Sequence, residues 1–170
     1  ELLVVDNSSE DGTIDLVNSF RDDRIKLFSI NNNGIIAKSR NLAIKKARGQ
    51  YIAFLDSDDW WLPTKLQTVS EYFENGADVV YHDLYIFWGR SGARFLAKKV
   101  FKTRDLQKPI ALDLLQKGNG MVNSGVTVRK SLVDLVGLIC ENERLVTSED
   151  YDYWIRLGTK SNKFQRVAKP

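Results

Sequence analysis

Residues 51–61 read YIAFLDSDDWW. The first five are apolar or aromatic, as in a buried strand, and Asp56, Ser57, Asp58 and Asp59 follow directly. Crowded carboxylates repel one another unless a cation or another partner neutralises them. In an open α/β sheet, ligands bind at the carboxyl ends of the strands. This stretch therefore predicts an α/β fold with a ligand site at the end of a core strand.

Strand-like and helix-like segments alternate along the rest of the chain. Apolar runs closed by turn residues predict strands at residues 1–5, 25–30, 51–55, 78–88, 93–101, 124–128 and 163–167. Helical spacing of apolar residues predicts helices at residues 13–20, 34–48, 64–75, 110–117, 131–136 and 148–160. Residues 89–92 (GRSG) predict a hairpin turn. This order implies an α/β fold with a mixed, mostly parallel sheet flanked by helices.

Composition narrows the class of protein. With 170 residues and 43% of them hydrophobic, the chain can bury the core of one globular domain. A net charge of +3 is too small and too dispersed to indicate nucleic-acid binding. Cys140 is the only cysteine, which excludes an intrachain disulfide and fits a reducing, cytoplasmic setting. No apolar run is long enough to span a membrane, so we expect membrane association only through parts absent from this chain.

Acidic residues follow two of the predicted strands. Asp6 ends the first strand, while Asp56 and Asp58 lie at the end of the third. Carboxylate oxygens without sulfur or imidazole suit Mg²⁺ or Mn²⁺, which commonly bind together with phosphates. The alternative is structural, because Asp58 or Asp59 can cap the following helix, which Pro63 introduces.

Four motifs in order carry a family resemblance. They are VVDNSSEDGT at residues 4–13, the pairs Asn33-Gly34 and Arg40-Asn41, ARGQYIAFLDSDD at residues 47–59, and SEDYDYWIRL at residues 148–157. Across essentially the whole chain, this pattern resembles the catalytic domain of a family 2 inverting glycosyltransferase. The resemblance implies the GT-A fold, which is Rossmann-like, and an Asp-x-Asp (DXD) motif at Asp56-Ser57-Asp58.

The resemblance also implies a domain organisation. Residues 1–170 form a single GT-A domain, with a nucleotide-sugar-binding half at residues 1–77 and an acceptor-binding half at residues 78–170. The family normally begins one strand earlier, so we expect an N-terminally truncated domain with a gap beside the strand at residues 1–5. Taken literally, such a chain is expected to bind the donor weakly or not at all.

Donor-binding roles follow residue by residue from the resemblance. Asp6 is expected to contact the nucleotide base, and Arg40 to lie near the base or the diphosphate. Asp56 is expected to contact the ribose or the waters of a divalent metal. Asp58 is expected to ligate that metal, Mn²⁺ or Mg²⁺, which bridges the diphosphate. The structural alternatives are that Asp6 caps the turn after its strand and that Arg40 pairs with an exposed acid.

Catalytic roles fall at the start of the last predicted helix. The resemblance makes Asp150 the general base, with Glu149 orienting the acceptor or the base. Both acids also suit the positive end of the helix that they begin, which is the structural alternative. Trp60, Trp61 and Trp154 either stack on an acceptor sugar or pack in the core, and His82 is expected to be an ordinary strand residue.

The expected reaction is transfer of one sugar from a nucleoside-diphosphate sugar, a UDP-sugar, to a hydroxyl of a glycan or lipid-linked sugar acceptor. The Gln-x-x-Arg-Trp signature of processive synthases does not occur in these residues, which favours single-sugar transfer in cell-surface polysaccharide biosynthesis, in the cytoplasm at the inner face of the cell membrane. One alternative is a sugar-nucleotide pyrophosphorylase. Another is a non-catalytic nucleotide- or metal-binding module or an inactive transferase fragment.

Overall fold

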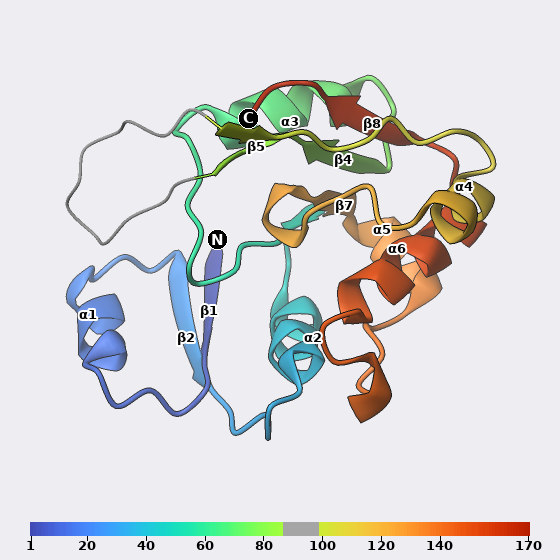
Figure 1. Cartoon of the computed structure of the whole chain (residues 1–170). Coiled ribbons are helices and arrows are strands. Elements are labelled where there is room, and N and C mark those ends of the chain that lie inside the picture. Colours follow the sequence, from blue (N-terminus) through green and yellow to red (C-terminus); the bar gives the residue numbers. More distant parts are fainter. Residues whose placement is uncertain (87–98) are drawn as a thin grey trace.

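The computed structural model describes residues 1–86 and 99–170, so the expected turn at residues 89–92 lies outside the described residues. The strands are β1 (Leu2–Asp6), β2 (Ile25–Ser29), β3 (Tyr51–Ala53), β4 (Val79–His82), β5 (Leu84–Ile86), β6 (Lys99–Phe101), β7 (Thr127–Arg129) and β8 (Phe164–Val167). The helices are α1 (Thr13–Ser19), α2 (Ile36–Lys46), α3 (Lys65–Glu74), α4 (Ile110–Lys117), α5 (Lys130–Val136) and α6 (Glu149–Lys160). The predicted alternation of strands and helices is confirmed (Figure 1).

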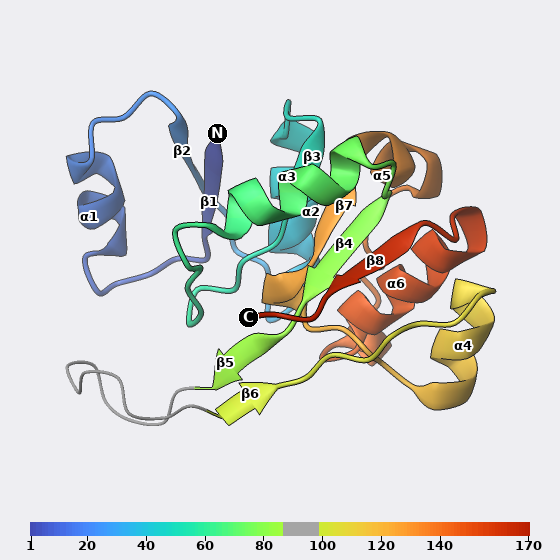
Figure 2. The ribbon, with the colours of Figure 1, turned by 90° about the horizontal axis from the view of Figure 1, so that it is seen from above.

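The sheet is mixed, as expected. Among the described residues, β1 pairs in parallel with β2, and a four-stranded sheet has the order β3-β7-β4-β8. β7 is antiparallel to both β3 and β4, whereas β8 is parallel to β4. The β1-β2 pair forms no ladder with β3 (Figure 2).

Strand β4 crosses the centre of the core. Its four residues, VVYH, are all buried, because α3 covers one face of the sheet and α5 and α6 cover the other (Figure 1). Val80 packs in a cluster with Val69 and Phe73 on the α3 side. Val79 and Tyr81 point to the opposite face, in the larger cluster. This alternation follows from the period of two along a strand.

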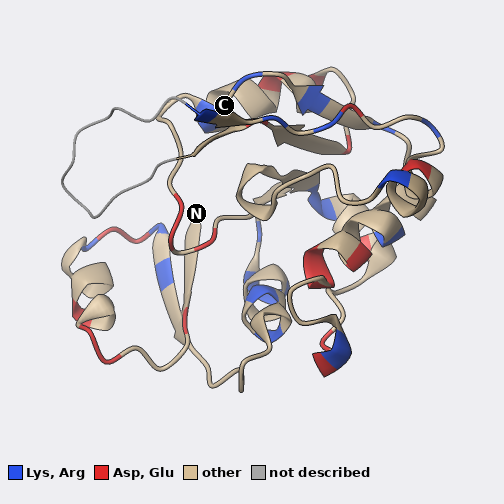
Figure 3. Ribbon diagram, in the orientation of Figure 1, with Lys and Arg blue, Asp and Glu red and all other residues tan. Residues whose placement is uncertain are grey.

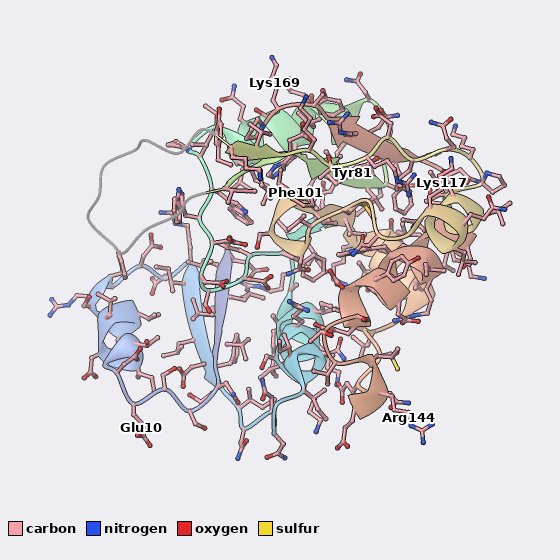
Figure 4. The ribbon with its side chains drawn as sticks, in the orientation of Figure 1. Glu10, Tyr81, Phe101, Lys117, Arg144 and Lys169 are labelled. Atoms are coloured by element: carbon pink, nitrogen blue, oxygen red, sulfur yellow. The ribbon has the colours of Figure 1, made fainter. Side chains whose placement is uncertain are left out.

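The expected single strand at residues 78–88 is wrong in one respect: the strand breaks at Asp83 into β4 and β5. The Asp83 carboxylate is buried, accepts hydrogen bonds from the Thr103 backbone and hydroxyl, and pairs with Arg166 at 2.9 Å. Beyond this point β5 leaves the main sheet and pairs with β6 instead. Nearby, the Tyr81 hydroxyl donates to the Arg104 carbonyl at 2.8 Å (Figure 4).

The expected strand at residues 124–128 also needs correction at its start. Asn123–Gly125 form a 3-10 turn, and β7 begins only at Thr127. The turn carries polar side chains toward the end of β3, since Asp56 donates its backbone N–H to the Ser124 hydroxyl at 3.0 Å. No helix among the described residues is long and apolar enough to cross a bilayer.

Candidate active site

Acidic residues follow β3 and occupy the first turn of α6, two segments far apart in the sequence. Figure 3 shows them in the loop that follows β3 and in the first turn of α6. We call residues 56–61 the acid loop. Because β3 ends at Ala53, the acidic residues of this loop lie beyond the end of that strand.

Arg40 joins the two acidic segments. It extends from α2, and its guanidinium lies 2.8 Å from Asp56 and 2.7 Å from Glu149. The Arg40 and Glu149 side chains are only 14% and 7% exposed, whereas Asp56 is 36% exposed. A guanidinium has several N–H groups and bridges two carboxylates well. The structure therefore places Arg40 between predicted site residues and excludes the alternative of an exposed surface pair.

Asn123 and Ser124 are site residues that the sequence reasoning missed. The Asn123 side-chain amide donates to the Asp56 carboxylate at 2.8 Å, and the Trp61 indole donates to the Ser124 carbonyl at 2.8 Å. The 3-10 turn thus holds both ends of the acid loop. The only signal in the sequence was an Asn-Ser-Gly triplet immediately before an apolar run, where residues 124–128 were expected to be strand.

Asp150 is half-buried at the start of α6, next to the buried Glu149. Burial raises the pKa of Asp150, and the nearby Glu149 and Asp56 carboxylates raise it further. Two contacts act the other way and lower this pKa. They are the hydrogen bond from the Tyr151 backbone N–H, at 2.6 Å, and the positive charge of Arg40. A carboxylate with a raised pKa is a stronger proton acceptor once it is ionised, as a general base requires.

Asp58 is exposed and has no hydrogen bond or ion pair to the parts of the chain that the structure describes. Asp56, in contrast, already accepts from Arg40 and Asn123 through one oxygen. No group of three or more His, Cys, Asp or Glu side chains that could hold a metal occurs among the described residues. The donor set fits a hard cation held by one or two carboxylates and completed by substrate phosphates.

Asp6 is 4% exposed at the end of β1. Both of its carboxylate oxygens accept a hydrogen bond from the Ser9 backbone N–H, at 3.3 and 3.2 Å. The structural alternative, a cap on the following turn, is therefore present. Contact with a nucleotide base remains a prediction, because the hydrogen bonds described for the Asp6 carboxylate both come from the nearby Ser9.

Trp60, Trp61 and Trp154 differ in their surroundings. Trp154 is fully buried and packs edge-on against Phe54, so it is a core residue. Trp60 is 58% exposed. Trp61 lies beneath the buried amine of Lys65, whose Nζ is 3.7 Å from the ring centroid. Of these three, only the two tryptophans of the acid loop are at least partly exposed.

The family model for glycosyl transferase family 2 matches residues 1–136 of the chain. Two similar proteins of Escherichia coli, WfgD and WfaP, are both named UDP-Glc:α-D-GlcNAc-diphosphoundecaprenol β-1,3-glucosyltransferase. WfgD is 32% identical over 95% of this chain and 59% of its own length. WfaP is 28% identical over 96% of this chain and 60% of its own length. The chain therefore spans about three fifths of these relatives.

A solved structure has the same fold. The crystal structure of residues 1–349 of TarS from S. aureus superposes with a TM-score of 0.73 and 22% identity, covering 100% of this chain and 49% of that one. A second TarS structure gives a TM-score of 0.75 with 23% identity, over 100% of this chain and 30% of that one. The predicted GT-A-type α/β fold is confirmed by this likeness.

Proposed function

Because this chain belongs to glycosyl transferase family 2, we propose that the protein transfers one sugar from a nucleoside-diphosphate sugar to an acceptor hydroxyl in polysaccharide biosynthesis. The observation that carries the proposal is the Arg40 bridge, which joins Asp56 of the acid loop to Glu149 beside Asp150. A donor-binding loop and a proton acceptor must lie together for such a transfer. We retain residues 1–77 as the donor half and residues 78–170 as the acceptor half.

The relatives suggest the substrates. WfaP and WfgD carry UDP-glucose and a GlcNAc-diphosphate lipid in their names. We therefore propose a UDP-sugar donor and a lipid-linked sugar acceptor for this protein. Asp6 is proposed to bind the uracil base, since its buried carboxylate ends β1 in the matching motif. Arg40 is proposed to approach the diphosphate while holding the two acids in place.

Asp58, assisted by Asp56, is proposed to hold Mn²⁺ or Mg²⁺ together with the diphosphate. When bound, the cation supplies a Lewis acid that neutralises negative charge on the departing diphosphate. Asp58 fits this role because its carboxylate is exposed and unpaired within the described part of the chain. Hydrogen bonds from Arg40 and Asn123 fix Asp56 and thereby hold the start of the acid loop in place.

Asp150 is proposed to accept the proton of the acceptor hydroxyl as that oxygen attacks the anomeric carbon. Attack from the side opposite the leaving diphosphate forms the new glycosidic bond and inverts the anomeric centre. Glu149 is proposed to fix the position of Asp150 through its ion pair with Arg40, at 2.7 Å. One Glu149 oxygen is buried without a hydrogen-bond partner among the described residues and is available to an acceptor hydroxyl.

The substitution Asp150→Asn separates a transferase from a non-catalytic nucleotide-binding module. The amide keeps the shape of the side chain but accepts no proton, so we expect turnover of UDP-glucose to fall by at least about 100-fold. Calorimetric UDP affinity should stay within about twofold of wild type. Asp152→Asn, two residues further along the same helix, is the matched control and should retain turnover. Equal activity of Asp150→Asn and wild type would refute the role.

A further inference from the structure

A cavity of about 260 Å³ borders the acid loop. The walls of this cavity include Asp58 and Asp59 of the loop, the start of α3 and the end of β4. The proposed base Asp150 and the nucleotide residues Asp6, Arg40 and Asp56 do not line it, whereas Asp58 does. Since Asp58 borders the cavity, any group bound there lies next to the proposed diphosphate site.

His82, on the wall formed by β4, has a nitrogen atom that requires a partner. Its Nδ1 lies 2.7 Å from the Asp83 carbonyl, which only accepts, so Nδ1 carries the proton and Nε2 a lone pair. The residue is 8% exposed, and Nε2 has no hydrogen-bond partner among the described residues. Burial is the main cause that lowers the pKa of His82, and the charge of Lys65 lowers it further. A neutral acceptor of this kind calls for an O–H or N–H donor.

Lys65 supplies the complementary group at the start of α3. It is 6% exposed, donates to the Thr127 hydroxyl at 3.1 Å and forms no ion pair within the described residues. Its amine lies over the Trp61 ring. Burial lowers the pKa of Lys65 to about 7. An amine has more than one N–H, so Lys65 retains donor capacity beyond Thr127.

We infer that this cavity is a subsite for one sugar ring of the transferase substrates, with a ring hydroxyl donating to His82 and another accepting from Lys65. The inference rests on the proposed function. A hydroxyl both donates and accepts, which matches this pair of nitrogen groups. The Asp58 and Asp59 carboxylates on the wall accept from hydroxyls but repel a phosphate group. The cavity size suits a single ring and not an oligosaccharide.

The ring can belong to the donor or to the acceptor, since both carry the same hydroxyl groups. The intact protein and its His82→Phe and Lys65→Met variants distinguish the two sources. His82→Phe keeps a planar ring but loses the lone pair, and Lys65→Met keeps a long side chain without the amine. In one arm, calorimetry measures the affinities for UDP and for UDP-glucose. In the other, UDP release is measured as the concentration of α-D-GlcNAc-diphosphoundecaprenol is varied.

Loss of one neutral hydrogen bond should weaken binding by about three- to tenfold. If the ring is the donor sugar, UDP-glucose affinity falls by this factor while UDP affinity is unchanged. If the ring is the acceptor sugar, the acceptor KM rises by this factor and both nucleotide affinities are unchanged. Tyr153→Phe is the control, since it removes a buried hydroxyl that bonds the Gly137 carbonyl at 3.0 Å, away from the cavity.

Two results would overturn the inference. One is that both variants leave UDP-glucose affinity and acceptor KM at the values of the control. The other is an equal loss of UDP and UDP-glucose affinity, which would mean that His82 and Lys65 only support the acid loop. The wild-type protein tests the proposed function separately: if it neither binds UDP nor turns over UDP-glucose, that proposal fails first, whatever the variants do.

Discussion

Arg40→Met tests the ion-pair bridge at the centre of the site. The substitution removes the guanidinium between Asp56 and Glu149 but retains most of the side-chain volume. Glu149 is only 7% exposed, so its carboxylate would remain buried without a counter-charge. Loss of one partner of a buried pair costs about 3–5 kcal/mol. Asp56 is 36% exposed and regains water, so we expect about 3 kcal/mol in total, near the low end.

Urea unfolding of the intact protein, followed by tryptophan fluorescence, measures this free energy. For a chain of this size, about 3 kcal/mol corresponds to a melting temperature lower by roughly 6–12 °C. Arg24→Met is the matched control, because Arg24 pairs with Asp22 at 2.6 Å but its side chain is 81% exposed. The double variant Arg40→Met/Glu149→Gln should recover part of the loss, since a neutral amide needs no counter-charge. An Arg40→Met protein as stable as Arg24→Met would refute this reasoning.

Three further outcomes are expected. Because the Glu149 charge raises the pKa of Asp150, Glu149→Gln should move the acid limb of the kcat/KM profile to lower pH; an unmoved or upward-shifted limb would contradict this. The folded-state pKa of Lys65 is about 7 against an ordinary 10.5, so the unfolded chain binds more protons between these values. The free energy of unfolding should therefore rise with pH across this range in wild type, and less in Lys65→Met, as chemical denaturation at several pH values will measure. In Gly158→Ala, the added Cβ would lie 2.9 Å from the Ala111 backbone nitrogen, so α4 must move away from α6. We expect the free energy of unfolding in urea to fall by about 1–3 kcal/mol. An unchanged free energy of unfolding would show that α4 shifts at little cost.

Periodicity predicted the elements well where the pattern was local. Helix α4 has the predicted bounds, residues 110–117, because its apolar stripe is read within the segment itself. Strand β4 was expected to continue past Asp83, since the apolar residues on both sides suit a strand. The break depends on Thr103 and Arg166, which bind Asp83 from about 20 and 83 residues away along the chain. A local pattern carries no information about such partners.

The same distinction holds for the site. Family motifs predicted Asp56, Asp58, Glu149 and Asp150 as site residues, and their roles stay predictions, whereas the family assignment itself is confirmed. Asn123 escaped notice because its hydrogen bond to Asp56 spans 67 residues. The motifs mark residues whose chemistry the reaction of the family is expected to need. They say little about the side chains that hold those residues in place.

Lys65 illustrates a related limit. In the sequence Lys65 lies in the first turn of a predicted helix, where a lysine is usually solvated, and no local feature indicates that it is buried. The amine then lies on the Trp61 ring and bonds Thr127 of β7. The cost of burying an amine is visible only in the folded protein. Its placement beside His82 is the basis of the sugar subsite inferred above.

The proposed function depends most on Asp58 holding a divalent cation together with a nucleoside diphosphate. The most direct test is calorimetric titration of UDP into the intact protein, with and without Mn²⁺, and into its Asp58→Asn variant. We expect UDP affinity to rise at least about tenfold with Mn²⁺ in wild type and to show no such rise in Asp58→Asn. UDP affinity that is equal with and without Mn²⁺, or a Mn²⁺ effect that survives in Asp58→Asn, would contradict the claim.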